Sequence, residues 1–95
     1  MRPEAKVQAA IVRYLKTIPD LWFTKLHGGP MQKAGLPDLC LVLRGFSIWL
    51  EVKSEDGKVT PLQEATMSRI RAAGGTAEVV RSVDDVRRIL ANKET

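Results

Sequence analysis

The chain has one cysteine, one histidine, few aromatic residues and no long apolar run. Cys40 alone cannot form an internal disulfide, and one cysteine with one histidine cannot supply the ligands of a structural zinc site. No window approaches the roughly 20 apolar residues of a transmembrane helix, and the N-terminus does not resemble a signal peptide. The sequence therefore excludes a disulfide scaffold and a zinc module. We expect an intracellular, cytoplasmic protein without membrane association.

The 95 residues predict a single domain, residues 1–95, whose core needs no disulfide or metal support. The formal net charge is +4, and the basic excess lies entirely within residues 1–36. A basic excess favours a polyanionic partner such as nucleic acid. For the charge alone, a solvated lysine-rich face is an equally good interpretation.

The spacing of apolar residues predicts the order of secondary structure. A helix is expected from Pro3 to about Thr17, a strand over residues 21–26, and a Gly- and Pro-rich mobile loop over residues 27–35. A hairpin over residues 38–53, a helix starting after Thr60, a strand over residues 76–80 and a helix capped by Ser82 follow. The second helix should turn one side inward, namely Leu62, Thr66, Ile70 and Ala73, and should stop at Gly74-Gly75.

The hairpin carries charged residues that core packing does not require. A period of two places Asp38 on one face of its first strand and Glu51 and Lys53 on one face of its second, while the opposite faces are wholly aliphatic. A type II′ turn at Gly45-Phe46 would pair Cys40 with Glu51 and Asp38 with Lys53. Asp38 and Glu51 are then diagonal neighbours on one face, about 7–8 Å apart. This arrangement depends on the turn, because a slip of one residue reverses the faces.

Two carboxylates on one sheet face repel each other unless a cation lies between them. A few carboxylates with water suit Mg²⁺ or Mn²⁺ better than Ca²⁺, so Asp38 and Glu51 are candidate ligands and the backbone carbonyl of Val52 is a further one. Lys53 on the same face would stabilise an attacking hydroxide or the charge developing on phosphorus. The set indicates metal-assisted phosphodiester hydrolysis. An Asp38–Lys53 salt bridge beside an exposed Glu51 fits the spacing equally well.

Other candidate site residues come from the flanking segments. Glu4 lies on the inward side of the first helix and could approach the metal through water or a second ion, although a first-turn Glu is also favoured by the helix dipole. Gln63 lies on the inward face of the second helix, near Ile70 and Met67, where a capping box alone would explain it. Candidates for substrate contact, each also readable as an ordinary solvated residue, are Lys25, His27, Gln32 and Lys33.

Several of these residues form a recognisable series. Gly35-Leu36-Pro37-Asp38, followed after twelve residues by Glu51-Val52-Lys53, resembles the Pro-Asp … Asp/Glu-x-Lys signature of the restriction-endonuclease-like (PD-(D/E)XK) nuclease superfamily. With Glu4 on a first helix and Gln63 opening the next, the set more closely resembles the VRR-NUC domain family. The resemblance extends over nearly the whole chain, and the elements occur in the expected order.

The resemblance implies an α/β fold with a single compact αβββαβ(α) core, in which helices flank a mixed sheet. It implies that Asp38, Glu51 and Lys53 are catalytic, with Glu4 as an additional acid and Gln63 near the active-site lysine. The implied activity is that of a Mg²⁺- or Mn²⁺-dependent endonuclease on DNA. Small stand-alone members resemble dimeric Holliday-junction resolvases, so we expect a homodimer that cuts branched DNA such as four-way junctions.

Two other functions stay open. The first is a non-catalytic nucleic-acid-binding module with the same fold, although all the expected acids and Lys53 are present. The second is a nuclease for linear duplex DNA or RNA, because the sequence has neither a base-reading helix nor an array of stacking aromatics that would settle the substrate.

Overall fold

The computed structural model describes residues 1–26 and 34–93. The elements follow in the order α1 (Pro3–Leu15), β1 (Leu21–Lys25), β2 (Leu39–Leu43), β3 (Phe46–Val52), α2 (Pro61–Ala72), β4 (Thr76–Val80) and α3 (Val83–Ala91). Their types and order confirm the sequence prediction, and the bounds of α1, β1 and the two hairpin strands differ from the expected ones by one or two residues. Within the described part of the chain, no helix has both the length and the apolar character that a membrane crossing requires.

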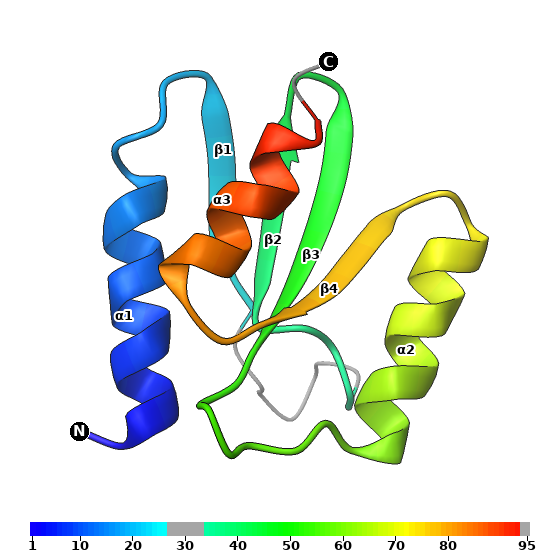
Figure 1. Ribbon diagram of the computed structural model, residues 1–95. Helices are drawn as coiled ribbons and strands as arrows, with labels where there is room; N and C mark the ends of the chain where they lie inside the picture. The colour runs from blue at the N-terminus through cyan, green and yellow to red at the C-terminus, as the bar shows by residue number, and fades with distance from the viewer. Residues whose placement is uncertain (27–33, 94–95) are drawn as a thin grey trace.

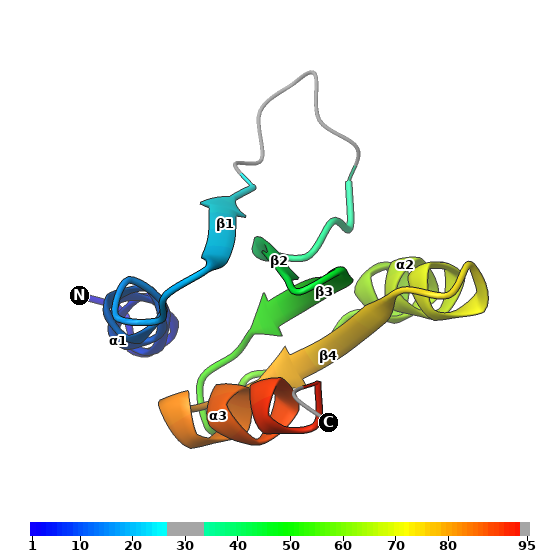
Figure 2. The same cartoon turned by 90° about the horizontal axis from the view of Figure 1, so that it is seen from above.

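The strands form one mixed sheet in the order β1-β2-β3-β4. The first three strands pair antiparallel, and β4 pairs parallel to β3. Figures 1 and 2 show α1 and α3 on one face of the sheet and α2 on the other, beside β3 and β4. The predicted α/β fold with a mixed sheet between helices is confirmed.

The core fills the space between the sheet and the pair α1 and α3. The aliphatic faces of β2 and β3 are almost completely buried, and they join side chains of both helices in one apolar cluster. The sheet contributes Leu39, Leu41, Leu43, Ile48, Leu50 and Val52, and the helices contribute Ile11, Leu15, Val86 and Leu90. Burial of these side chains is the main term that stabilises the fold. Because side chains alternate along a strand, this packing directs the polar side chains of the hairpin to the opposite face.

The predicted turn of the hairpin is wrong by one residue. Leu43 pairs with Phe46, so the central turn residues are Arg44 and Gly45 instead of Gly45 and Phe46. Both adopt positive φ, 48° and 89°, as a type I′ turn requires, and the twist of that turn matches the twist of the flanking strands. Cys40 consequently pairs with Trp49 instead of Glu51.

The correction moves every pair by two positions, which preserves the faces. Continuing the observed register beyond Leu39↔Leu50 sets Asp38 beside Glu51, whereas the predicted register sets it beside Lys53. A shift by an even number of residues leaves each side chain on its original face, since the pleat repeats every two residues. The two carboxyl groups are therefore nearer neighbours than the sequence predicted.

Helix α2 begins with the predicted capping box and has Pro61 at its start. Met67, which was predicted beside Gln63 on the inward face, is fully buried, but Leu62 was predicted inward and is 53% exposed. Leu62 lies against Gly35, since a Cβ added to Gly35 would come within 2.7 Å of Leu62 Cγ. Gly35 therefore permits the close approach of its loop to the first turn of α2.

Met67→Ala is expected to lower the free energy of unfolding by about 2–5 kcal/mol, because it leaves a cavity beneath α2. Leu62→Ala on the same helix should cost less than about 1 kcal/mol, since half of that side chain is already in water. Urea unfolding of both variants measures the difference. Equal losses would contradict the observed orientation of α2.

Candidate active site

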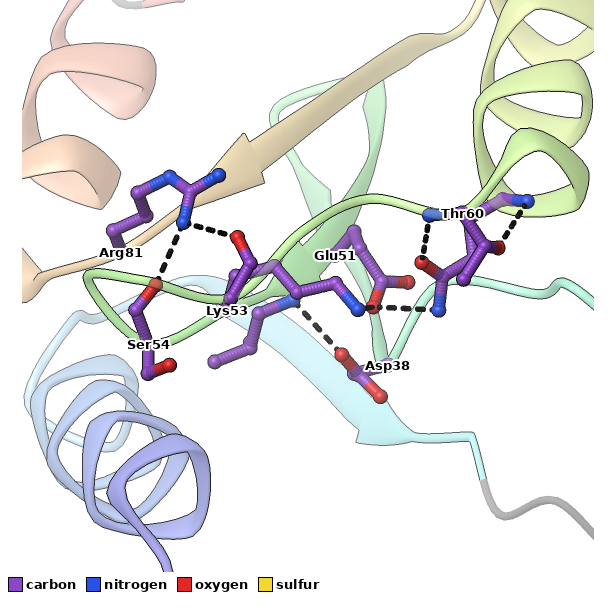
Figure 3. A network of polar contacts seen from close by, with 9 residues as sticks. Asp38, Glu51, Lys53, Ser54, Thr60 and Arg81 are labelled. Atoms are coloured by element: carbon purple, nitrogen blue, oxygen red, sulfur yellow. Dashed lines mark hydrogen bonds and ion pairs between the residues drawn. The ribbon is translucent and has the colours of Figure 1, made fainter.

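Asp38 lies immediately before β2 and is fixed from several sides. Its backbone N–H donates to the carbonyl of Leu50 (3.0 Å), and its own carbonyl accepts from the N–H of Leu26 (2.8 Å). Its carboxylate Oδ2 accepts from the backbone N–H of Val52 at 2.8 Å. Figure 3 shows the Asp38 side chain directed toward the end of β3, where Glu51 and Lys53 lie. The hairpin therefore sets the direction of this carboxyl group.

Glu51 is the last residue but one of β3, and Lys53 directly follows the strand. Both are buried, with 2% and 8% of their surfaces exposed, and Lys53 Nζ is 3.7 Å from Glu51 Oε2. The backbone N–H of Lys53 donates to the carbonyl of Val80 (3.0 Å), which continues the pairing with β4. The alternative of an exposed Glu51 beside an Asp38–Lys53 salt bridge is therefore wrong, since Glu51 is buried and in contact with Lys53.

Gln63 reaches the same cluster from α2. Its Nε2 donates to Glu51 Oε2 at 3.2 Å, and its Oε1 accepts from the backbone N–H of Thr60 at 3.0 Å. The capping-box interpretation of Gln63 is thus confirmed, and the other end of the same amide contacts Glu51. A role for Gln63 in the reaction stays a prediction.

The electrostatic environment of Glu51 favours its protonated form. Burial, followed by the nearby charge of Asp38 and a side-chain hydrogen bond with Asp38, raises the pKa of Glu51 to about 8. Lys53 opposes this shift, and Glu4 adds to it weakly. Excess negative charge in a buried site is relieved either by a proton or by a cation.

The donor chemistry of the pair fits a hard divalent cation. Asp38 and Glu51 present carboxylate oxygens side by side, which is the ligand type that Mg²⁺ and Mn²⁺ prefer. No third His, Cys, Asp or Glu joins them in a ligand group within residues 1–26 and 34–93. Water and substrate would have to complete the coordination, as is usual for Mg²⁺.

The other predicted site residues are less closely associated with the pair. Glu4 is exposed in the first turn of α1 and acts on Glu51 through its charge. Val52 is buried between Glu51 and Lys53, and its carbonyl stays a predicted ligand. Lys25 is exposed at the end of β1. His27, Gln32 and Lys33 lie outside the described residues.

Sequence reasoning missed Arg81, which holds the loop that follows Lys53. Its Nη1 donates to the carbonyls of Ser54 (2.6 Å), Gly57 (2.7 Å) and Glu55 (3.3 Å). Figure 3 shows the guanidinium above this loop. Arg81 and Ser54 are 27 residues apart in the sequence, and no local sequence pattern predicts an interaction between such distant residues.

The metal-free protein is expected to become less stable as pH rises from about 5 to about 8. In this range folded Glu51 keeps a proton, because its pKa is raised to about 8, while the unfolded chain has already released it. The folded state thus binds more protons, so the free energy of unfolding falls with increasing pH. Thermal unfolding in a chelator should show this decline in the wild type and a flatter profile in Glu51→Gln. Parallel profiles for the two proteins would contradict it.

Comparison with known proteins gives consistent matches. The family model of the VRR-NUC domain matches residues 4–84, a range that includes the whole cluster. A solved structure described as "VRR_NUC domain" is 28% identical, with a TM-score of 0.79 over 96% of this chain and 97% of that one. Another, "VRR_NUC domain protein", shares the fold at 20% identity, with a TM-score of 0.74 over 95% and 86%. No match was found among curated protein sequences. The chain therefore belongs to the VRR-NUC domain family, which is a nuclease-type family.

Proposed function

We propose that this protein is a divalent-metal-dependent endonuclease that hydrolyses phosphodiester bonds in DNA. The observation that carries the proposal is the buried cluster at the end of the hairpin. There the carboxyl groups of Asp38 and Glu51 adjoin each other, and Lys53 and Gln63 both contact Glu51 Oε2. Membership in a nuclease-type family supports the same reaction class.

The side chains have separate roles in this proposal. Asp38 and Glu51 would hold Mg²⁺ or Mn²⁺, with the Val52 carbonyl and Glu4 as further ligands, the latter through water. When bound, such an ion polarises a phosphoryl oxygen and acidifies water. The Val52 N–H keeps the Asp38 carboxylate oriented, and Gln63 does the same for Glu51.

Lys53 is the proposed group that acts on the reacting phosphate. Its ammonium is buried and lies 3.7 Å from Glu51 Oε2, so its charge acts in a site that excludes most water. A fixed positive charge there stabilises an attacking hydroxide or the negative charge that builds on the phosphoryl oxygens. Arg81 restrains the loop after Lys53 and so limits the movement of this lysine.

The proposed substrate is branched DNA such as a four-way junction, cut by a homodimer. The basic excess of residues 1–36 supports a nucleic-acid partner, and Lys25, His27, Gln32 and Lys33 are the proposed phosphate contacts. One chain has a radius of gyration of only 12.8 Å, which offers little surface to a junction. A two-fold dimer would present two equivalent sites to two strands.

The wild type is expected to cut DNA only when Mg²⁺ or Mn²⁺ is present. Asp38→Asn and Lys53→Met should each reduce the rate about 100-fold or more, because the first removes a carboxylate ligand of the ion and the second removes the positive charge at the reacting phosphate. Matched controls are Asp56→Asn and Lys58→Met, exposed positions in the loop that follows the site. Labelled four-way, flapped, nicked and linear DNA, with an RNA duplex, form the substrate panel.

The panel also separates the competing functions. Paired, symmetrical cuts in the four-way junction would support the dimeric junction nuclease. Faster cleavage of linear duplex or RNA would replace the proposed substrate but retain the enzyme. Tight binding without any metal-dependent cleavage would contradict the proposal and favour a binding module of the same fold.

A further inference from the structure

We propose that the capping box of α2 is part of the active site, and that Thr60 acts through Gln63 as a positioning residue for Glu51. The inference rests on the proposed metal-dependent nuclease function and adds a residue to it. Thr60 is exposed and does not touch either carboxyl group. It instead holds in place the side-chain amide of Gln63, which contacts Glu51.

The capping box determines which end of the Gln63 amide faces Glu51. Thr60 Oγ1 accepts from the backbone N–H of Gln63 at 3.1 Å, and the Thr60 N–H donates to Gln63 Oε1 at 3.0 Å. The amide nitrogen is therefore the end directed at Glu51 Oε2. A flipped amide would place its oxygen against the carboxylate and its nitrogen against the Thr60 N–H, so two attractive contacts would become repulsive.

Contacts from the protein orient both carboxyl groups of the proposed metal site. Glu51 Oε2 interacts with Gln63 and Lys53, and Asp38 Oδ2 accepts from the Val52 N–H. The two carboxyl groups also share a side-chain hydrogen bond with each other. The protein thus fixes the direction of both carboxyl groups, and a cation bound between them would take the place of the shared proton. Hydrogen bonds that orient metal ligands in this way commonly govern metal affinity.

A purely structural role for Thr60 makes a different prediction, and α3 offers the comparison. Ser82 caps α3 by accepting from the N–H of Asp85 at 3.2 Å, just as Thr60 caps α2. Ser82 has no contact with Gln63 or with either carboxyl group among the described interactions. Ser82→Ala therefore removes a helix cap of the same kind while leaving the Gln63–Glu51 contact in place.

The test is Mn²⁺ binding to the full chain by titration calorimetry, with DNA cleavage measured in parallel. Gln63→Met should weaken Mn²⁺ binding about 10-fold or more, the range found when a partner of a metal ligand is removed. Thr60→Val should weaken it less, because the backbone N–H of Thr60 is retained while the helix start loosens. Thr60→Ser, which keeps the hydroxyl, should restore binding. Ser82→Ala should lower the unfolding temperature as Thr60→Val does but leave Mn²⁺ affinity unchanged.

Each outcome decides a distinct point. Wild-type affinity in Gln63→Met or Thr60→Val, in a protein that binds Mn²⁺ and cleaves DNA, would overturn the inference and leave the proposed function intact. Equal weakening in Thr60→Val and Ser82→Ala would also overturn it, since helix stability alone would then explain the loss. A wild type that neither binds Mn²⁺ nor cleaves DNA would contradict the proposed function itself, and the inference with it.

Discussion

Two carboxyl groups are held against each other inside this protein, and the rest of the site depends on that contact. Burial and the charge of Asp38 raise the pKa of Glu51 to about 8, which means that the folded chain keeps both groups close at an electrostatic cost. Lys53 offsets only part of this cost. Such an arrangement is typical of functional sites, where a buried charge needs a ligand or reaction partner. A divalent cation between the two groups would remove their repulsion. When no cation is bound, a proton on Glu51 relieves that repulsion instead.

The scaffold explains why the two groups cannot move apart. The aliphatic faces of β2 and β3 are buried against α1 and α3, so the hairpin cannot slip by one residue without exposing its core. Asp38 is further fixed by the Val52 N–H, and Glu51 by Gln63. The residues that stabilise the fold and those that form the site therefore belong to opposite faces of the same two strands.

Much of the fold and of the candidate site was predictable from the sequence, because these features depend on local patterns. Alternation along the strands correctly predicted the faces of Asp38, Glu51 and Lys53. Thr60, Pro61 and Gln63 correctly predicted the capping box of α2. The turn was not predictable, since Arg44 adopts a left-handed conformation that its residue type does not signal. The contacts of Arg81 depend on a segment that is distant in sequence, which periodicity does not encode. The prediction succeeded because the error in the turn moved the strand pairing by an even number of residues.

Proton release on metal binding tests the central claim most directly. Mn²⁺ titrated into the wild type near pH 7, in two buffers with different ionisation enthalpies, gives the number of protons displaced by each ion. If the paired carboxyl groups form the metal site, binding releases close to one proton, because Glu51 is largely protonated below its raised pKa. Glu51→Gln should lose both the binding and the release. Binding that displaces no proton, or that persists unchanged in Glu51→Gln, would contradict a site built on the Asp38–Glu51 pair.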